Sequence, residues 1–176
     1  MMRVAARAGV VVAVILSVSC ASKPDDPAVQ LSDVGMVLHL PPPMQAALNA
    51  FAPGFHPVMP SSFRSDVAQA AAAATGQMQT LFATVGDFDG DGTVDAVEEG
   101  NVPGDTALRV IAIMNGKTPV AMDVTRFEAY DADAVGVYLS KVPAGQSGAF
   151  EIVNYPDETM LYRWQGGHLV GTKVSG

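Results

Sequence analysis

The chain lacks most residues that disulfide frameworks, zinc sites and nucleic-acid surfaces require. It contains one cysteine, Cys20, so no disulfide can form within the chain. The three histidines, His39, His56 and His168, show no spacing typical of zinc ligands. Only 10 Lys and Arg stand against 18 Asp and Glu, a formal net charge of -8. This acidic balance argues against nucleic acid as a partner.

Familiar catalytic motifs are missing too. No serine lies in a Gly-x-Ser-x-Gly elbow, and no glycine-rich phosphate loop occurs. Ser147 has glycines nearby, but not at the spacing that the elbow requires. Asp131 and Asp133 are expected to form an acidic turn, and Tyr162 and Trp164 to pack as ordinary core aromatics. We therefore expect no enzymatic activity.

The apolar run at residues 9–18 is too short to cross a bilayer, since a transmembrane helix needs ~20 residues. It follows Arg3 and Arg7 and ends in small residues, a pattern typical of a secretory signal peptide. We expect residues 1–19 to be removed on export. The alternative, a buried N-terminal helix, is disfavoured by the flanking arginines and by the polar Pro/Asp stretch that follows.

Cys20 directly follows this run, in the sequence ILSVSCAS. The segment resembles the lipobox of bacterial lipoproteins, although Ser17 stands where that family usually has leucine. The resemblance implies that Cys20 becomes an acylated N-terminus. Because Ala21 and Ser22 are not the aspartate that marks inner-membrane retention, it also implies the outer membrane. An ordinary signal-peptidase cut near Ala21, giving a periplasmic or extracellular protein, is the alternative.

The rest of the chain suits a tether and one domain. Residues 20–35 are polar and contain Pro and Asp without periodicity, which predicts a flexible tether. Residues 36–176 are expected to form a single α+β domain. In it, short N-terminal helices precede an antiparallel β-meander.

Turn residues and hydrophobic patterns place the elements of this domain. A strand is expected at 34–40, and three prolines at 41–43 then open a helix over 44–51. Residues 61–76 predict an alanine-rich helix that ends at Gly76, with a flexible segment as the alternative. Short strands separated by Gly, Pro, Asn and Asp are expected at 81–85, 94–98, 108–114, 120–127, 136–142, 150–155, 160–165 and 168–174.

The stretch GDFDGDGTVDAVEE concentrates carboxylates between two of these strands. With Asp87 at position 1, Asp89, Asp91 and Asp95 fall at positions 3, 5 and 9. Gly92 permits the turn, and the backbone carbonyl of Thr93 falls at position 7. Oxygen ligands at this spacing suit Ca²⁺, whereas the absence of His and Cys from the loop disfavours zinc. A solvated acidic turn is the alternative.

The segment VGDFDGDGTVDAV resembles the calcium loops of FG-GAP and VCBS-type repeats, which are common in exported bacterial proteins. The resemblance covers about 13 of 176 residues, and no second copy of the loop occurs, so it implies the loop and its hairpin but no propeller. It also implies that the four aspartates and one backbone oxygen hold the ion. The whole chain resembles uncharacterised secreted bacterial proteins that carry one such loop.

The same residues also match the EF-hand pattern, in which Glu98 at position 12 would be the last ligand. An EF-hand needs a helix on each side, here from Ala96 to at least Asp105. Gly100, Pro103 and Gly104 disfavour that helix, so we expect strand-loop-strand and keep Glu98 as a possible ligand.

These observations predict an exported, lipid-anchored, non-enzymatic domain that uses calcium structurally. Its expected partners are the membrane, through lipid on Cys20, and another protein at the cell envelope. Two alternatives remain open at this point. One is a secreted enzyme or enzyme inhibitor with a structural calcium, and the other is an EF-hand-type calcium-binding protein.

Overall fold

The computed structural model describes residues 26–32, 35–75, 81–128, 131, 133–141 and 148–174. The predicted signal peptide and Cys20 lie outside the described residues. So do Gly76, at the predicted end of a helix, and Ser147.

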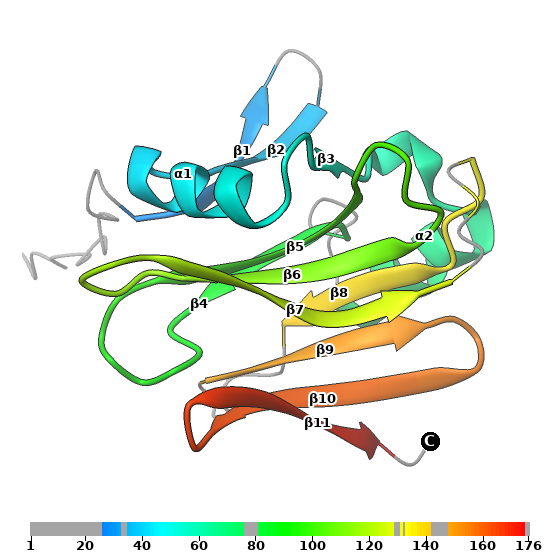
Figure 1. The fold of residues 1–176 in the computed structure, drawn as a ribbon. Helices are drawn as coiled ribbons and strands as arrows, with labels where there is room; N and C mark the ends of the chain where they lie inside the picture. The colour runs from blue at the N-terminus through cyan, green and yellow to red at the C-terminus, as the bar shows by residue number, and fades with distance from the viewer. Residues whose placement is uncertain are drawn as a thin grey trace, which may run out of the picture.

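Two antiparallel sheets pack face to face and enclose the main hydrophobic core (Figure 1). The first contains β3 (His56–Pro57), β4 (Ala83–Gly86), β5 (Asp95–Asn101), β6 (Leu108–Met114) and β7 (Val120–Phe127). The second follows the order β11-β10-β9-β8, with β8 (Val137–Lys141), β9 (Ala149–Asn154), β10 (Glu158–Gln165) and β11 (His168–Val174). Their facing side chains, among them Val97, Val110, Phe150 and Ile152, are almost fully buried.

A third, two-stranded sheet precedes them. Strands β1 (Ala28–Ser32) and β2 (Gly35–His39) pair antiparallel, from Ala28 opposite His39 to Ser32 opposite Gly35. The prediction of a flexible tether over 20–35 is therefore wrong for Ala28–Ser32. This stretch pairs with β2, the strand that was predicted at 34–40. The polar composition of residues 20–35 gave no sign of this pairing.

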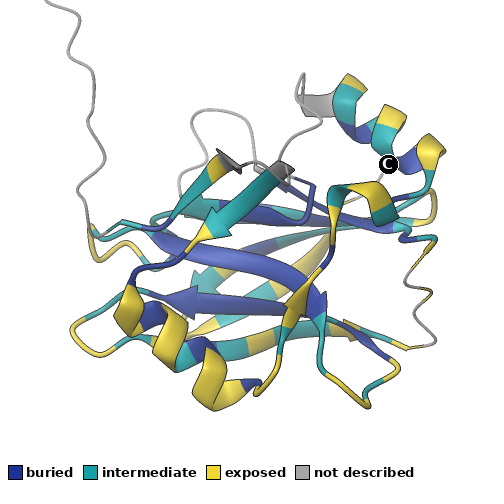
Figure 2. Ribbon diagram, turned by 90° about the horizontal axis from the view of Figure 1, so that it is seen from above, coloured by how far each residue is buried: buried dark blue, intermediate teal, exposed yellow. Residues whose placement is uncertain are grey.

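Two α-helices occur in the described chain. Helix α1 (Pro42–Phe51) begins at the expected prolines and lies on the outer face of the first sheet. There Met44 and Leu48 pack with Ile111 and Ile113 of β6. Figure 2 shows the buried stripe of α1 against the sheet and its exposed residues on the other side. Helix α2 (Ser65–Thr75) follows a 3₁₀ turn, η1 (Pro60–Ser62), and packs Val67 and Ala71 into the main core.

The predicted α+β class is wrong. Among the described residues, 49% lie in strands and 17% in helices, and the strands form three antiparallel sheets. The strands lie close to their predicted positions, but the expected single meander divides into two sheets. One of them continues to β7 and the other starts at β8. Strand spacing predicts hairpins well, because turn residues mark them, but it does not show where the chain leaves one sheet for another.

Candidate metal centre

The acidic loop connects β4 to β5, as the strand-loop-strand prediction required. The two strands pair antiparallel, and their last matched residues before the loop are Gly86 and Asp95. Within the loop Gly90 and Gly92 have φ angles of 81° and 87°. A Cβ at either position would meet nothing within 4 Å, so the backbone conformation, rather than space, calls for glycine there.

Backbone N–H groups hold the loop in a tight curl. The carboxylate of Asp87 accepts hydrogen bonds from Gly90 N at 2.8 Å and from Gly92 N at 3.1 Å. Asp89 accepts one from Asp91 N at 3.1 Å. Each bond uses one of about four lone-pair sites on a carboxylate, so oxygen lone pairs remain for a cation.

Three of the predicted ligands come together at this loop. One carboxylate oxygen each from Asp87, Asp89 and Asp95 lies within 4.8 Å of the other two, an arrangement that could hold a metal ion. At an effective dielectric of ~20, two unit charges at this separation repel by roughly 3 kcal/mol. A cation among the three would turn this repulsion into attraction.

Asp95 is the most constrained member of the group. It is fully buried at the start of β5, and its two oxygens accept hydrogen bonds from Phe88 N and Asn115 N, each at 2.8 Å. Burial raises the pKa of its carboxyl to about 6, and the nearby charge of Asp89 adds to the rise, whereas hydrogen bonds from the backbone of Asn115, Phe88 and Asp89 lower it. An ionised carboxylate in this position therefore lacks a compensating positive charge.

Asp91 is not among the three aspartates that come together. The exposed carboxylate of Asp91 accepts hydrogen bonds from Thr93 N at 2.7 Å and from the Thr93 hydroxyl at 2.6 Å. These bonds lower the pKa of Asp91, with the hydroxyl contributing most. The Thr93 hydroxyl also contacts the backbone carbonyl of Asn115. Asp91 and Thr93 thus fix the end of the loop to the turn between β6 and β7.

Glu98 is not brought to this cluster. It lies in the middle of β5, where it pairs with Ala83 of β4 and Ile111 of β6. Because side chains alternate along a strand, residues 95 and 98 project from opposite faces of β5. The helix that an EF-hand would need from Ala96 is instead a strand to Asn101, so the EF-hand interpretation is wrong for this loop.

Phe88 anchors the loop to the second sheet, a role that the sequence analysis missed. Its buried ring packs edge-on against Phe150 of β9, with 5.0 Å between centroids and 63° between planes. Phe150 in turn stacks on Tyr162 of β10 at 5.5 Å. The available signal was a large apolar side chain inside an otherwise polar loop, which is typical of a residue that returns to the core.

Comparisons of the chain with protein-family models, with curated proteins and with solved structures found no match. The resemblances of the Cys20 segment and of the acidic loop therefore stay predictions. In the part of the chain that the structure describes, no helix is long and apolar enough to span a membrane.

Proposed function

We propose that this chain is an exported, lipid-anchored domain without enzymatic activity, in which a calcium ion fastens the β4–β5 loop to the sandwich. Its task is structural support or protein interaction at the cell envelope. The observation that carries the calcium assignment is the buried carboxylate of Asp95 next to those of Asp87 and Asp89. The side-chain donors that come together are carboxylate oxygens, which favours Ca²⁺ over zinc.

Export and lipid anchoring are supported by the signal-peptide pattern and by the position of Cys20. An extracytoplasmic location fits the calcium proposal, since extracellular modules bind the ion at ~10⁻⁴ to 10⁻³ M. At such affinities the site is filled by ambient calcium and acts as a permanent structural element. Binding to the folded form at ten times Kd stabilises it by ~1.4 kcal/mol.

The test is thermal unfolding of the chain with excess CaCl₂ and with chelator. We expect calcium to raise Tm by about 3–6 °C, which follows from ~1.4 kcal/mol in a domain of this size. Asp95→Asn should abolish the calcium-dependent shift. It should also lower Tm in chelator, because the amide nitrogen replaces one of the two oxygens that accept hydrogen bonds from Phe88 N and Asn115 N. Circular dichroism and calorimetry both report Tm.

Asp157→Asn is the matched control, since it removes one exposed acid from a turn outside the loop. It should keep the calcium-dependent shift of the unmodified protein. Equal Tm values with calcium and with chelator in the unmodified protein would refute the calcium site. An undiminished shift in Asp95→Asn would place the ion elsewhere.

A further inference from the structure

Strand β7 is the last strand of the first sheet, and one of its edges has no partner among the described residues. It pairs with β6 alone. The outward edge therefore presents unpaired backbone N–H and C=O groups, which are a template for pairing with another chain.

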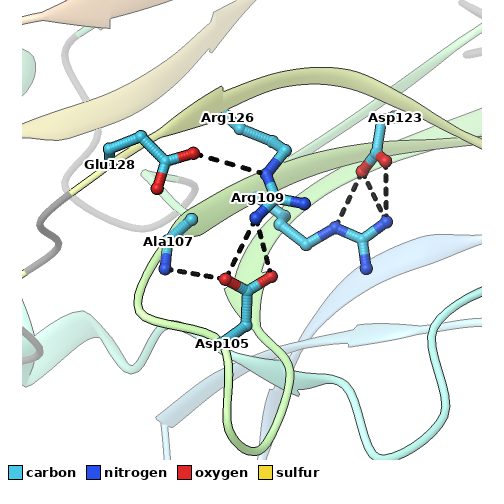
Figure 3. Close-up of polar contacts among 6 residues, drawn as sticks. All are labelled: Asp105, Ala107, Arg109, Asp123, Arg126 and Glu128. Carbon is cyan, nitrogen blue, oxygen red and sulfur yellow. Dashed lines mark hydrogen bonds and ion pairs between the residues drawn. The ribbon is translucent and has the colours of Figure 1, made fainter.

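A β-bulge brings two opposite charges to the same face of this edge. Val110 pairs with Thr125 and Ile111 with Asp123, so Val124 is an extra residue between them. Without the bulge, residues 123 and 126 would project from opposite faces of the strand. With it, Asp123 and Arg126 both lie on the outer face beside Arg109, as Figure 3 shows.

Both charged groups keep bonding capacity for a further partner. Arg109 donates to both oxygens of Asp123 at 2.8 Å, and Arg126 donates to both oxygens of Asp105 at 3.0 Å. A guanidinium carries five N–H donors and a carboxylate about four lone-pair sites, so neither is saturated. The side chains of Asp123 and Arg126 are 37% and 44% exposed.

The inner face of the same edge carries apolar and polar side chains and is incompletely filled. By their pairing with β6, Met122, Thr125 and Phe127 project toward the second sheet. A cavity of about 180 Å³ lies there. It is lined by Thr125, Phe127, Ile152, Asn154, Glu158, Met160 and Tyr162. An added strand next to β7 would place its own inward side chains beside this space.

We propose that β7 pairs antiparallel with β7 of a second copy of this chain, with Asp123 opposite Arg126 of the second copy. Two-fold symmetry then gives two such ion pairs on the outer face. In the same register Met122 lies opposite Phe127 of the second copy on the inner face. Methionine is a flexible side chain that fills irregular gaps, which suits the cavity beneath Phe127.

Other registers lose this complementarity. A shift of two residues in one direction sets Asp123 opposite Val124, and the same shift in the other direction sets it opposite Glu128, a like charge. A shift of one residue puts Asp123 opposite an inward-facing position. Strand β11 also has an open edge among the described residues. It contains Lys173 but no Asp or Glu, so pairing with a second β11 would form no ion pair between the two strands.

The formal charge of -8 opposes association of two copies, so local charge pairing must favour it.

The test is the molar mass of the full chain carrying Cys20→Ser, measured by sedimentation equilibrium with CaCl₂ and with chelator. We expect a dimer, and we expect Arg126→Glu to weaken dimerisation by about 10- to 100-fold, since it sets like charges opposite each other twice. Lys117→Glu changes the net charge equally at an exposed position of the β6–β7 turn and should leave the dimer intact. The thermal melt of each variant verifies that it is folded.

Disulfide formation tests the register. In the Cys20→Ser background, a mixture of Val124→Cys and Thr125→Cys chains should cross-link more than either variant alone, because these positions lie directly opposite each other. A monomeric parent chain, or a dimer that Arg126→Glu leaves unchanged, would overturn the proposal. Strand β7 lies outside the calcium loop, so we expect the dimer to persist in chelator. The dimer proposal can therefore be tested whether or not the loop binds calcium.

Discussion

Two adjacent carboxylic acids, Glu98 and Glu99, project from opposite faces of β5, and both are withdrawn from water. Glu98 is 3% exposed and Glu99 is 0% exposed. Neither oxygen of Glu99 has a hydrogen-bond partner among the described residues. Burial raises the pKa of Glu98 to about 8, and burial together with the charge of Glu98 raises the pKa of Glu99 well above its usual value. Both groups therefore favour the protonated form in the folded chain.

The stability of the fold should consequently fall as the pH rises. The pKa of Glu98 is about 8 in the folded chain and about 4.5 when unfolded, so its contribution is complete below pH 4.5 and is lost as the pH rises through 8. Between pH 5 and 7.5 the loss amounts to at most about 1.4 kcal/mol per pH unit. Glu98→Gln should remove this contribution of Glu98 to the pH dependence of stability. Urea unfolding at several pH values, with saturating calcium, measures both slopes.

Glu128→Gln is the control for this measurement, since it neutralises an exposed acid and should retain the pH dependence of the parent chain. Parallel slopes for the parent and Glu98→Gln would show that Glu98 titrates normally.

At the scale of single residues, the sequence predicted the cluster but not its complete membership. The spacing of Asp87, Asp89 and Asp95 was sufficient, because a curled loop turns alternate side chains inward. It could not show that Asp91 bonds to Thr93 instead, since that depends on the position of the β6–β7 turn. The predicted strand at 94–98 already places residues 95 and 98 on opposite faces, which disfavours Glu98 as a ligand, but it could not show that Glu98 is buried.

At the scale of elements, local signals were reliable and long-range ones were absent. The strands predicted at 108–114 and 120–127 are confirmed. They were predictable because Gly, Pro and Asn mark their ends. The helix opened by prolines is confirmed as α1. The pairing of Ala28–Ser32 with β2 was missed. The division into two sheets and the bulge at Val124 were also missed, because each is decided by contacts between distant segments.

Helix α1 should depend on burial for its stability. It has only 10 residues, no side-chain cap and no acidic residue in its first turn, so local interactions support it weakly. Leu48 is buried between Met44, Ile111 and Ile113, and Leu48→Ala should destabilise the domain by about 2–5 kcal/mol. Chemical denaturation at fixed calcium measures this change.

Asn49→Ala is the companion variant, because Asn49 is exposed on the same helix and accepts a hydrogen bond from the Gln45 side chain at 3.0 Å. Its effect should stay within about 0.5 kcal/mol. Similar losses in the two variants would mean that α1 does not pack on the sheet as described.

At the scale of the whole molecule, the acidic chain should not adhere to anionic lipid by charge. The predicted removal of residues 1–19 would take away two arginines and no acid, which would make the remaining chain more acidic than the formal -8. Under the proposed anchoring, covalent lipid on Cys20 supplies the membrane attachment. A single acyl chain binds only marginally, so attachment calls for more than one.

We expect the expressed chain to incorporate labelled fatty acid and to fractionate with membranes, and Cys20→Ala to lose both properties. Radioactive palmitate followed by detergent extraction measures them. Ser22→Ala, two residues away, should keep the label. An unlabelled parent chain would contradict the anchor while leaving the calcium site unaffected.

Phe88 connects the proposed ion site to the second sheet. Its neighbours in sequence, Asp87 and Asp89, supply two of the three converging carboxylates, while its own ring rests on Phe150 in the opposite sheet. Under the calcium proposal, a change in aromatic packing deep in the second sheet would therefore alter calcium affinity without touching a ligand. Coupling of this kind is reciprocal, so occupancy of the loop must equally restrain the motion of those rings.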